Sequence, residues 1–78
     1  MNEKEILRQA MKVRGMTQAM LADAAGYRSQ TNISEILRGQ TLKTQTLVRL
    51  LDAMGFDLII KDRNGSNREN VWKVEFGK

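Results

Sequence analysis

The stretch from Thr17 to Gly39, TQAMLADAAGYRSQTNISEILRG, constrains the fold of this chain more than any other part of the sequence. It holds two short segments, and each begins with a hydroxyl residue, Thr17 or Ser29, whose side chain suits the cap of a helix. Each segment also ends at a glycine, the residue most often found where a helix stops. These glycines are Gly26 and Gly39. The stretch therefore predicts two short helices joined by a tight turn, the second of them over residues 29–38.

Helical spacing of apolar residues continues on both sides of this pair. Before it, Asn2 is a suitable cap for a helix over about residues 3–14. After it, the spacing predicts a fourth helix over about residues 43–54, which Gly55 stops. The apolar residues predicted to face the core are Ile6, Leu7, Ala10 and Val13 in the first of these helices and Leu47, Leu50, Leu51 and Met54 in the second.

The pattern changes at Gly55, from helical spacing to the alternation that is typical of strands. The segment FDLIIK is rich in residues that favour strands, and VWKVEF places Trp72, Val74 and Phe76 on one face. The polar loop DRNGSNREN separates the two segments, so a hairpin is predicted, with its alternating face in the core. Because an isolated two-stranded ribbon is barely stable in water, it must pack on the helices or pair with strands of another chain.

These elements predict a mainly α fold, in which a bundle of four helices over residues 1–55 is followed by a C-terminal β-hairpin over residues 56–78. A chain of 78 residues suits one small domain. Its own core gives only marginal stability, so association with a second copy would help.

The composition argues against several classes of function. The chain has no cysteine and no histidine, which removes the usual thiolate and imidazole metal ligands and the commonest general base. It also has no phosphate-binding glycine loop, so we expect no enzyme, catalytic residue, metal or cofactor. The start MNEKEIL is unlike a signal peptide, and no apolar run is long enough to span a bilayer. We therefore expect no membrane contact and a cytoplasmic location, with which the absence of cysteine is compatible.

The helix predicted over residues 29–38 has one apolar and one polar side. Successive residues turn by about 100° around an α-helix, so Ile33, Ile36 and Leu37 share one arc. The remaining side chains are Thr31, Glu35 and Arg38 opposite this arc, Ser34 and Asn32 on its shoulders, and Gln30 at the exposed tip. One side of the helix is thus anchored, and the other offers hydrogen-bonding groups.

Amides and hydroxyls at the start of an anchored helix suit the edges of DNA bases. Asn or Gln bonds two positions of adenine, and Ser or Thr serves several bases. Neighbouring arginine and lysine side chains are placed for phosphates. The formal charge of +4 permits nucleic acid as a partner, although a merely soluble basic protein fits it equally well. The candidate DNA-binding residues are Gln18, Arg28, Ser29, Gln30, Thr31, Asn32, Ser34, Glu35, Arg38 and Lys43.

The same stretch resembles the lambda-repressor-like helix-turn-helix of the Cro and Xre type. The resemblance rests on Thr17-Gln18, Leu21-Ala22, Gly26, Ile33-Ser34 and Gly39, and it covers about residues 7–55. It implies a homodimeric transcriptional repressor that reads a palindromic site in double-stranded DNA, with the helix over residues 29–38 in the major groove.

The spacing departs from the family pattern at one place, since YRSQTN between Gly26 and Ile33 is one residue longer than usual. Alignment on Ile33 makes residues 30–32, 34 and 35 the base readers. Alignment on Gly26 moves Arg28 and Ser29 toward the bases instead.

The C-terminal strands are similar to those of HipB-like antitoxin repressors, which pair a strand across a dimer. This resemblance implies that residues 56–78 are a dimerisation element. The expected dimerisation residues are Phe56, Leu58, Ile59, Ile60, Trp72, Val74 and Phe76. The alternative is a hairpin folded back on its own helices. A second hypothesis for the function follows: an antitoxin that neutralises a toxin protein and regulates its own operon.

Overall fold

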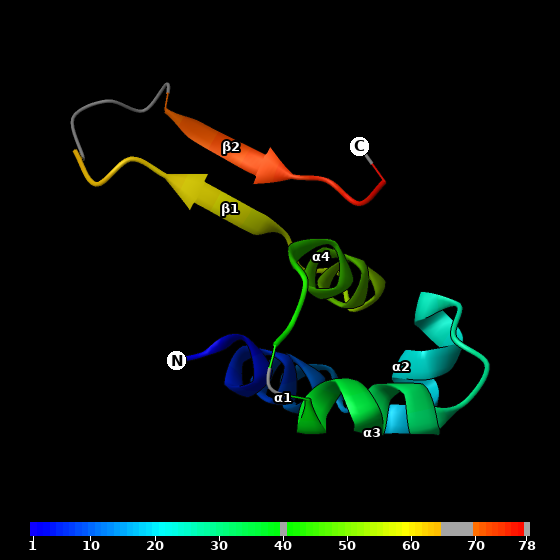
Figure 1. Cartoon of the computed structure of the whole chain (residues 1–78). Helices are drawn as coiled ribbons and strands as arrows, with labels where there is room; N and C mark the ends of the chain where they lie inside the picture. The colour runs from blue at the N-terminus through cyan, green and yellow to red at the C-terminus, as the bar shows by residue number, and fades with distance from the viewer. Residues whose placement is uncertain (40, 65–69, 78) are drawn as a thin grey trace.

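The computed structural model describes residues 1–39, 41–64 and 70–77. This part of the chain forms four helices followed by a two-stranded antiparallel hairpin, which confirms the predicted mainly α fold (Figure 1). The elements are α1 (Glu3–Arg14), α2 (Gln18–Ala25), α3 (Gln30–Arg38), α4 (Thr44–Ala53), β1 (Leu58–Lys61) and β2 (Val71–Val74). The helices lie within one residue of the predicted ranges. Much of the predicted polar loop, at residues 65–69, lies outside the described residues.

Local signals at the helix ends behave as the sequence predicts. The Oδ1 atom of Asn2 accepts a hydrogen bond from the backbone N–H of Glu5 at 2.9 Å and caps α1. The hydroxyl of Thr17 accepts one from the N–H of Met20 at 3.1 Å and caps α2. Gly26 ends α2 with a positive φ of 80°, a conformation that favours glycine. These contacts lie within a few residues of each other, which is why the sequence alone predicts them.

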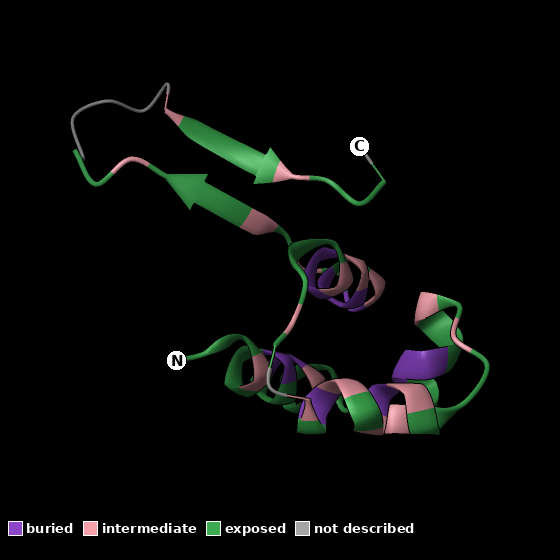
Figure 2. Ribbon diagram, in the orientation of Figure 1, coloured by how far each residue is buried: buried purple, intermediate pink, exposed green. Residues whose placement is uncertain are grey.

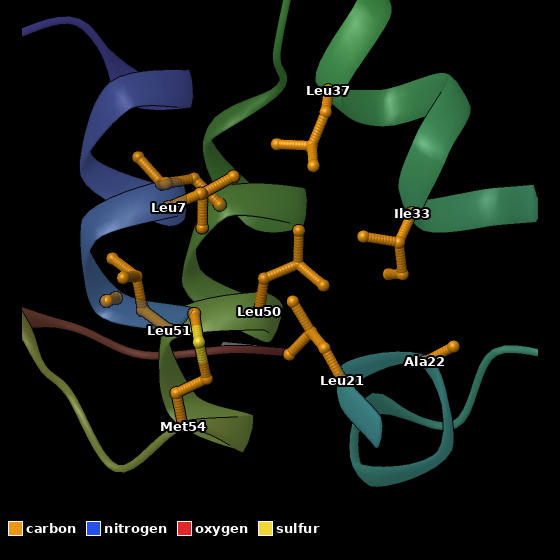
Figure 3. Packing of buried hydrophobic residues seen from close by; sticks show 10 residues of the cluster. Leu7, Leu21, Ala22, Ile33, Leu37, Leu50, Leu51 and Met54 are labelled. Carbon is orange, nitrogen blue, oxygen red and sulfur yellow. The ribbon is translucent and has the colours of Figure 1, made fainter. Parts of the chain in front are cut away.

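The hydrophobic core forms where the helices cross. One almost fully buried side chain comes from each helix: Leu7, Leu21, Ile33 and Leu50. Figure 3 shows Leu50 between Leu7 on one side and the α2–α3 pair on the other. All four core residues predicted in the last helix are buried, and Val48 joins them. Because burying a Leu or Ile side chain stabilises by roughly 1.5–3 kcal/mol, this cluster holds α2 and α3 in place.

The apolar stripe predicted for α1 is wrong at two positions. Leu7 and Ala10 are buried, but the side chains of Ile6 and Val13 are 39% and 66% exposed. Both line a groove between α1 and the base of the hairpin instead of the core between the helices. The periodicity predicts which residues share a face, but it does not fix how wide a face the neighbouring helix covers.

The hairpin is packed at one end and exposed at the other. Its register pairs Leu58 with Val74 and Ile60 with Trp72, so these four side chains lie on one face. Leu58 and Val74 are half-buried near the helices, whereas Ile60 and Trp72 are 54% and 58% exposed (Figure 2). The prediction that the alternating face belongs to the core is therefore wrong for Trp72, and also for Phe76, which is 48% exposed. The far half of the ribbon extends beyond α4 (Figure 1), and more than half of Ile60 and of Trp72 stays exposed.

The base of the hairpin is fixed to α4. Gln45, in the first turn of α4, donates from Nε2 to the carbonyl of Glu75 at 3.1 Å and accepts from the N–H of Gly77 at 2.8 Å. A salt bridge of 3.3 Å joins Lys73 of β2 to Asp57, just before β1. The C-terminal segment is therefore tied to the helical bundle, although the end of the ribbon that carries Trp72 is not.

Candidate nucleic-acid interface

Helix α3 is anchored on one side and open on the other. Ile33 and Leu37 are 0% and 6% exposed, and Ile36 packs against the same core. Thr31 and Glu35, on the opposite side, are exposed, as Arg38 is. The structure therefore confirms the division of faces predicted from helical geometry.

The start of α3 presents its polar side chains in two different ways. The helix begins at Gln30, and both Arg28 and Ser29 precede it. The amide oxygen of Asn32 accepts from the backbone N–H of Ser29 at 3.3 Å, so part of this half-buried side chain caps the helix. Within the described residues, the exposed side chains of Gln30 and Thr31 make no hydrogen bond. Their full hydrogen-bonding capacity is open to a partner.

The other candidate residues lie at the ends of α2, α3 and α4 rather than at one point. Arg28 and Arg38 flank α3, whose length of nine residues corresponds to about 13 Å. The Nε atom of Arg38 lies 3.4 Å from the carbonyl of Ser34, one turn earlier. Lys43 is the N-cap residue of α4, and half-buried Gln18 opens α2. Arg28, Arg38 and Lys43 are all exposed, so their charges face water and are open to phosphates.

The turn between α2 and α3 is held from α4 by Arg49, a residue that the sequence does not single out. Its Nε atom donates to the carbonyl of Ala25 at 2.8 Å, and its Nη2 atom donates to that of Gly26 at 3.2 Å. The same guanidinium lies 4.0 Å from the centre of the Tyr27 ring, a cation–π contact. Arg49 thus fixes the turn that sets the position of α3.

Two further arginines, both on α1, each bond a backbone carbonyl group at the end of a different helix. Arg8 reaches Leu37 at 3.4 Å, near the end of α3, and Arg14 reaches Met54 at 2.8 Å, at the end of α4. The last carbonyl groups of a helix have no partner within it, and they form the negative end of its dipole. Three of the 13 basic residues therefore hold the fold together. No short motif marks them, because donor and acceptor are 23 to 40 residues apart.

The residues predicted for dimerisation fall into two groups. Phe56 and Leu58 pack against the core of their own chain, and the guanidinium of Arg14 lies 4.2 Å from the Phe56 ring centre. Val74 is half-buried beside Leu58. The remaining residues expose much of their apolar surface, namely Ile59, Ile60, Trp72 and Phe76.

A family model described as a helix-turn-helix domain matches residues 5–59, which span most of α1, all of α2 to α4 and the start of β1. The chain belongs to this helix-turn-helix family. Membership indicates a DNA-binding regulator and therefore DNA as a partner. No curated protein and no solved structure matches the chain. Among the described residues, no helix of this helix-turn-helix protein has the length and apolar character needed to cross a membrane.

Proposed function

We propose that this helix-turn-helix protein is a sequence-specific transcriptional repressor that binds a palindromic operator as a homodimer, with α3 in the major groove. The observation that carries the proposal is the two-sided character of α3. Ile33 and Leu37 fix the helix from behind, while Gln30 and Thr31 remain exposed at its N-terminal end. A rigid helix with open amide and hydroxyl groups at its start is what reading of base edges requires.

Base reading is assigned to the first turns of α3. The Gln30 amide is suited to two hydrogen bonds with adenine, and Thr31 offers a hydroxyl and a methyl group. Asn32 retains its NH₂ group for a base while its oxygen caps the helix. Ser34 and Glu35 follow on the same side, and the Glu35 carboxylate is suited to the amino group of cytosine.

Phosphate contacts are assigned to the basic residues around α3. Arg28, Arg38 and Lys43 are exposed and lie before, at the end of and after this helix. The N-terminal amides of α2, with Gln18 beside them, form a further place for a phosphate, because the start of a helix is electropositive. Such contacts orient the protein on DNA and make the affinity depend on salt.

The exposed apolar surface of the hairpin supports the homodimer. A contiguous exposed apolar surface often marks a protein interface. A two-fold dimer presents two copies of α3 about one DNA turn apart, which corresponds to a palindromic operator. In this proposal, repression results from occupation of a promoter by the dimer.

The same surface supports a second candidate, an antitoxin whose hairpin binds a toxin protein and whose α3 regulates the operon. The 58% exposure of Trp72 is the observation in its favour, since tryptophan is enriched at the centres of protein interfaces. Co-purification of a partner encoded by the adjacent gene would support this candidate over the first.

The proposal is tested by selecting binding sites from a random duplex library and titrating the selected site at several salt concentrations. We expect a palindromic site, and we expect Gln30→Ala and Asn32→Ala to lower the affinity for it. Met20→Gln is a matched control, because Met20 is an exposed α2 side chain with no assigned DNA contact. Enrichment of no sequence, with affinity that depends only on salt, would contradict sequence-specific reading.

A further inference from the structure

An apolar groove of about 430 Å³ lies between α1 and the base of the hairpin. Its lining includes Ile6, Ala10 and Val13 on α1 and Leu58 and Ile59 on β1. Three of these side chains are exposed, with Val13 at 66%, Ile59 at 46% and Ile6 at 39%. The groove is therefore formed largely by apolar residues that the monomer leaves in contact with water.

The same chain also carries an apolar projection. Ile60 and Trp72 are paired across β1 and β2 on one face of the hairpin, and both are more than half exposed. Figure 1 shows the hairpin extending away from the bundle, on the side of α4 opposite to α3. Aromatic anchors that enter a pocket supply much of the energy of protein interfaces.

The charges at one end of the groove and at the far end of the hairpin have opposite sign. Glu3 and Glu5 are exposed in the first turn of α1, beside Ile6 of the groove. Lys61 and Arg63 are exposed toward the far end of β1. The single ion pair found among the described residues joins Lys73 and Asp57, so it engages none of these four side chains. The Ile6 end of the groove is therefore acidic, whereas exposed Lys12 makes the Val13 end basic. A basic hairpin end is attracted to the Ile6 end of the groove.

We propose that the groove is occupied by the hairpin of a second copy of this chain, with Ile60 and Trp72 against Ile6 and Val13. When a groove and a projection that fit each other lie on one chain, a two-fold axis places both contacts in one closed dimer. The proposal rests on the homodimer proposed above, and it identifies α1 as the half of the interface that the sequence does not predict. The hairpin half of the interface lies on the opposite side of α4 from α3 (Figure 1).

A second copy fits the groove better than a small ligand does. Small-molecule sites combine an apolar lining with a few convergent polar groups. Here the polar residues of the lining are Gln9 and Asp57, and the Asp57 carboxylate is already paired with Lys73. A partner that covers both the groove and the projection must supply apolar surface, and the hairpin does so.

The experiment measures self-association of the full chain by sedimentation equilibrium, for the wild type and for Trp72→Ala, Val13→Glu and Met20→Gln. We expect each of the first two substitutions to weaken the dimer at least ~10-fold. Met20→Gln, which changes an exposed apolar residue of α2 outside the groove, is expected to leave it unchanged. Circular dichroism shows whether each variant is folded, and Ile6→Lys replaces Val13→Glu if that variant is not.

Mixing the two interface variants gives the decisive result. Trp72→Ala retains an intact groove and Val13→Glu retains an intact hairpin, so a mixed dimer keeps one of its two contacts. We expect mixed dimers to form more readily than dimers of either variant alone. Failure of mixing to restore association would overturn the proposal, as would a monomeric wild type or variants that dimerise like the wild type.

The tryptophan supplies an independent signal, because Trp72 is the only tryptophan of the chain. We expect its emission to shift to longer wavelength as the wild type is diluted and dissociates. In Val13→Glu, the emission is expected to lie at the longer wavelength at every concentration.

DNA binding is measured separately, so a dimer that binds no duplex would contradict the proposed function while leaving the interface intact. If Val13→Glu still forms a dimer that binds DNA, the proposed interface is contradicted and the proposed function is not.

Discussion

Arg49 of α4 holds the turn between α2 and α3 through one guanidinium group. It bonds two carbonyl groups at the end of α2, at 2.8 and 3.2 Å, and stacks on Tyr27. We expect Arg49→Ala to lower the free energy of unfolding by about 1–3 kcal/mol, because a part-buried and an exposed carbonyl group lose their donors and Tyr27 loses its cation–π partner. Arg49→Lys should restore only part of this, since an ammonium lacks the planar fork. Urea denaturation measures the free energy of unfolding of both variants. Exposed Arg63→Ala is the control, and equal stability of Arg49→Ala and Arg63→Ala would contradict this role.

Two glycines of the helix-turn-helix stretch differ in what they require. Gly26 has φ 80°, and a Cβ atom there would lie 3.3 Å from Nη2 of Arg49. Gly39 has φ −64°, which any residue adopts. We expect Gly26→Ala to destabilise by roughly 1–2 kcal/mol and Gly39→Ala by clearly less. Thermal unfolding of the pair measures the difference, and similar melting temperatures would show that the left-handed turn is not the constraint.

At the scale of elements, the sequence predicts the helices and the strands well because their signals are local. Asn2 and Thr17 cap the helices that follow them, and Leu50 belongs to a stripe with helical spacing. The errors arise where burial depends on neighbours distant in the chain. Val13 and Trp72 carry the correct periodicity, but more than half of each residue is exposed. The same holds for the candidate site. The exposed face of α3 follows from the spacing of nearby residues, whereas the bonds from Arg49 to the turn before α3 join residues distant in the chain.

At the end of the hairpin away from the helices, Asp62 accepts two hydrogen bonds that depend on pH. The side-chain amide of Asn70 donates to Asp62 at 2.9 Å, and so does the backbone N–H of Asn64. These bonds, the first more than the second, lower the pKa of Asp62 below its ordinary value. Its contribution to stability is therefore present above the pKa of the unfolded chain and is lost as the pH falls through the lower folded value, below about pH 4.

We expect the amide resonance of Asn64 to titrate with Asp62 in this acidic range and to stay constant in Asp62→Asn. Two-dimensional NMR across the range measures both. A resonance of Asn64 that moves equally in the variant would show that another group causes the change.

At the scale of the whole molecule, base and phosphate contacts are separable by how binding responds to salt. Arg28→Ala is expected to weaken binding to all sequences and to reduce the slope of log affinity against log salt by about 1. Gln30→Ala is expected to leave the slope unchanged and to cost ~1–3 kcal/mol of discrimination at its base. Fluorescence anisotropy with the selected site and a scrambled duplex measures both quantities. A change of slope in Gln30→Ala would assign this residue to the backbone instead.

The dimer makes a further difference to DNA binding, because two copies of α3 reach the operator together. If the exposed hairpin holds the dimer, a monomeric Trp72→Ala variant binds each half-site alone and loses the gain that comes from linking the two. We expect weaker binding to the palindrome, with about half the salt slope for each bound unit, since only half the phosphates are contacted. The affinity for an isolated half-site should stay near that of the wild-type subunit, because α3 lies on the other side of α4 from the hairpin that carries Trp72 (Figure 1). Titration of full and half operators with Trp72→Ala and Met20→Gln measures this. A monomeric variant that binds the palindrome as tightly as the wild type would show that a single helix-turn-helix domain is the reading unit.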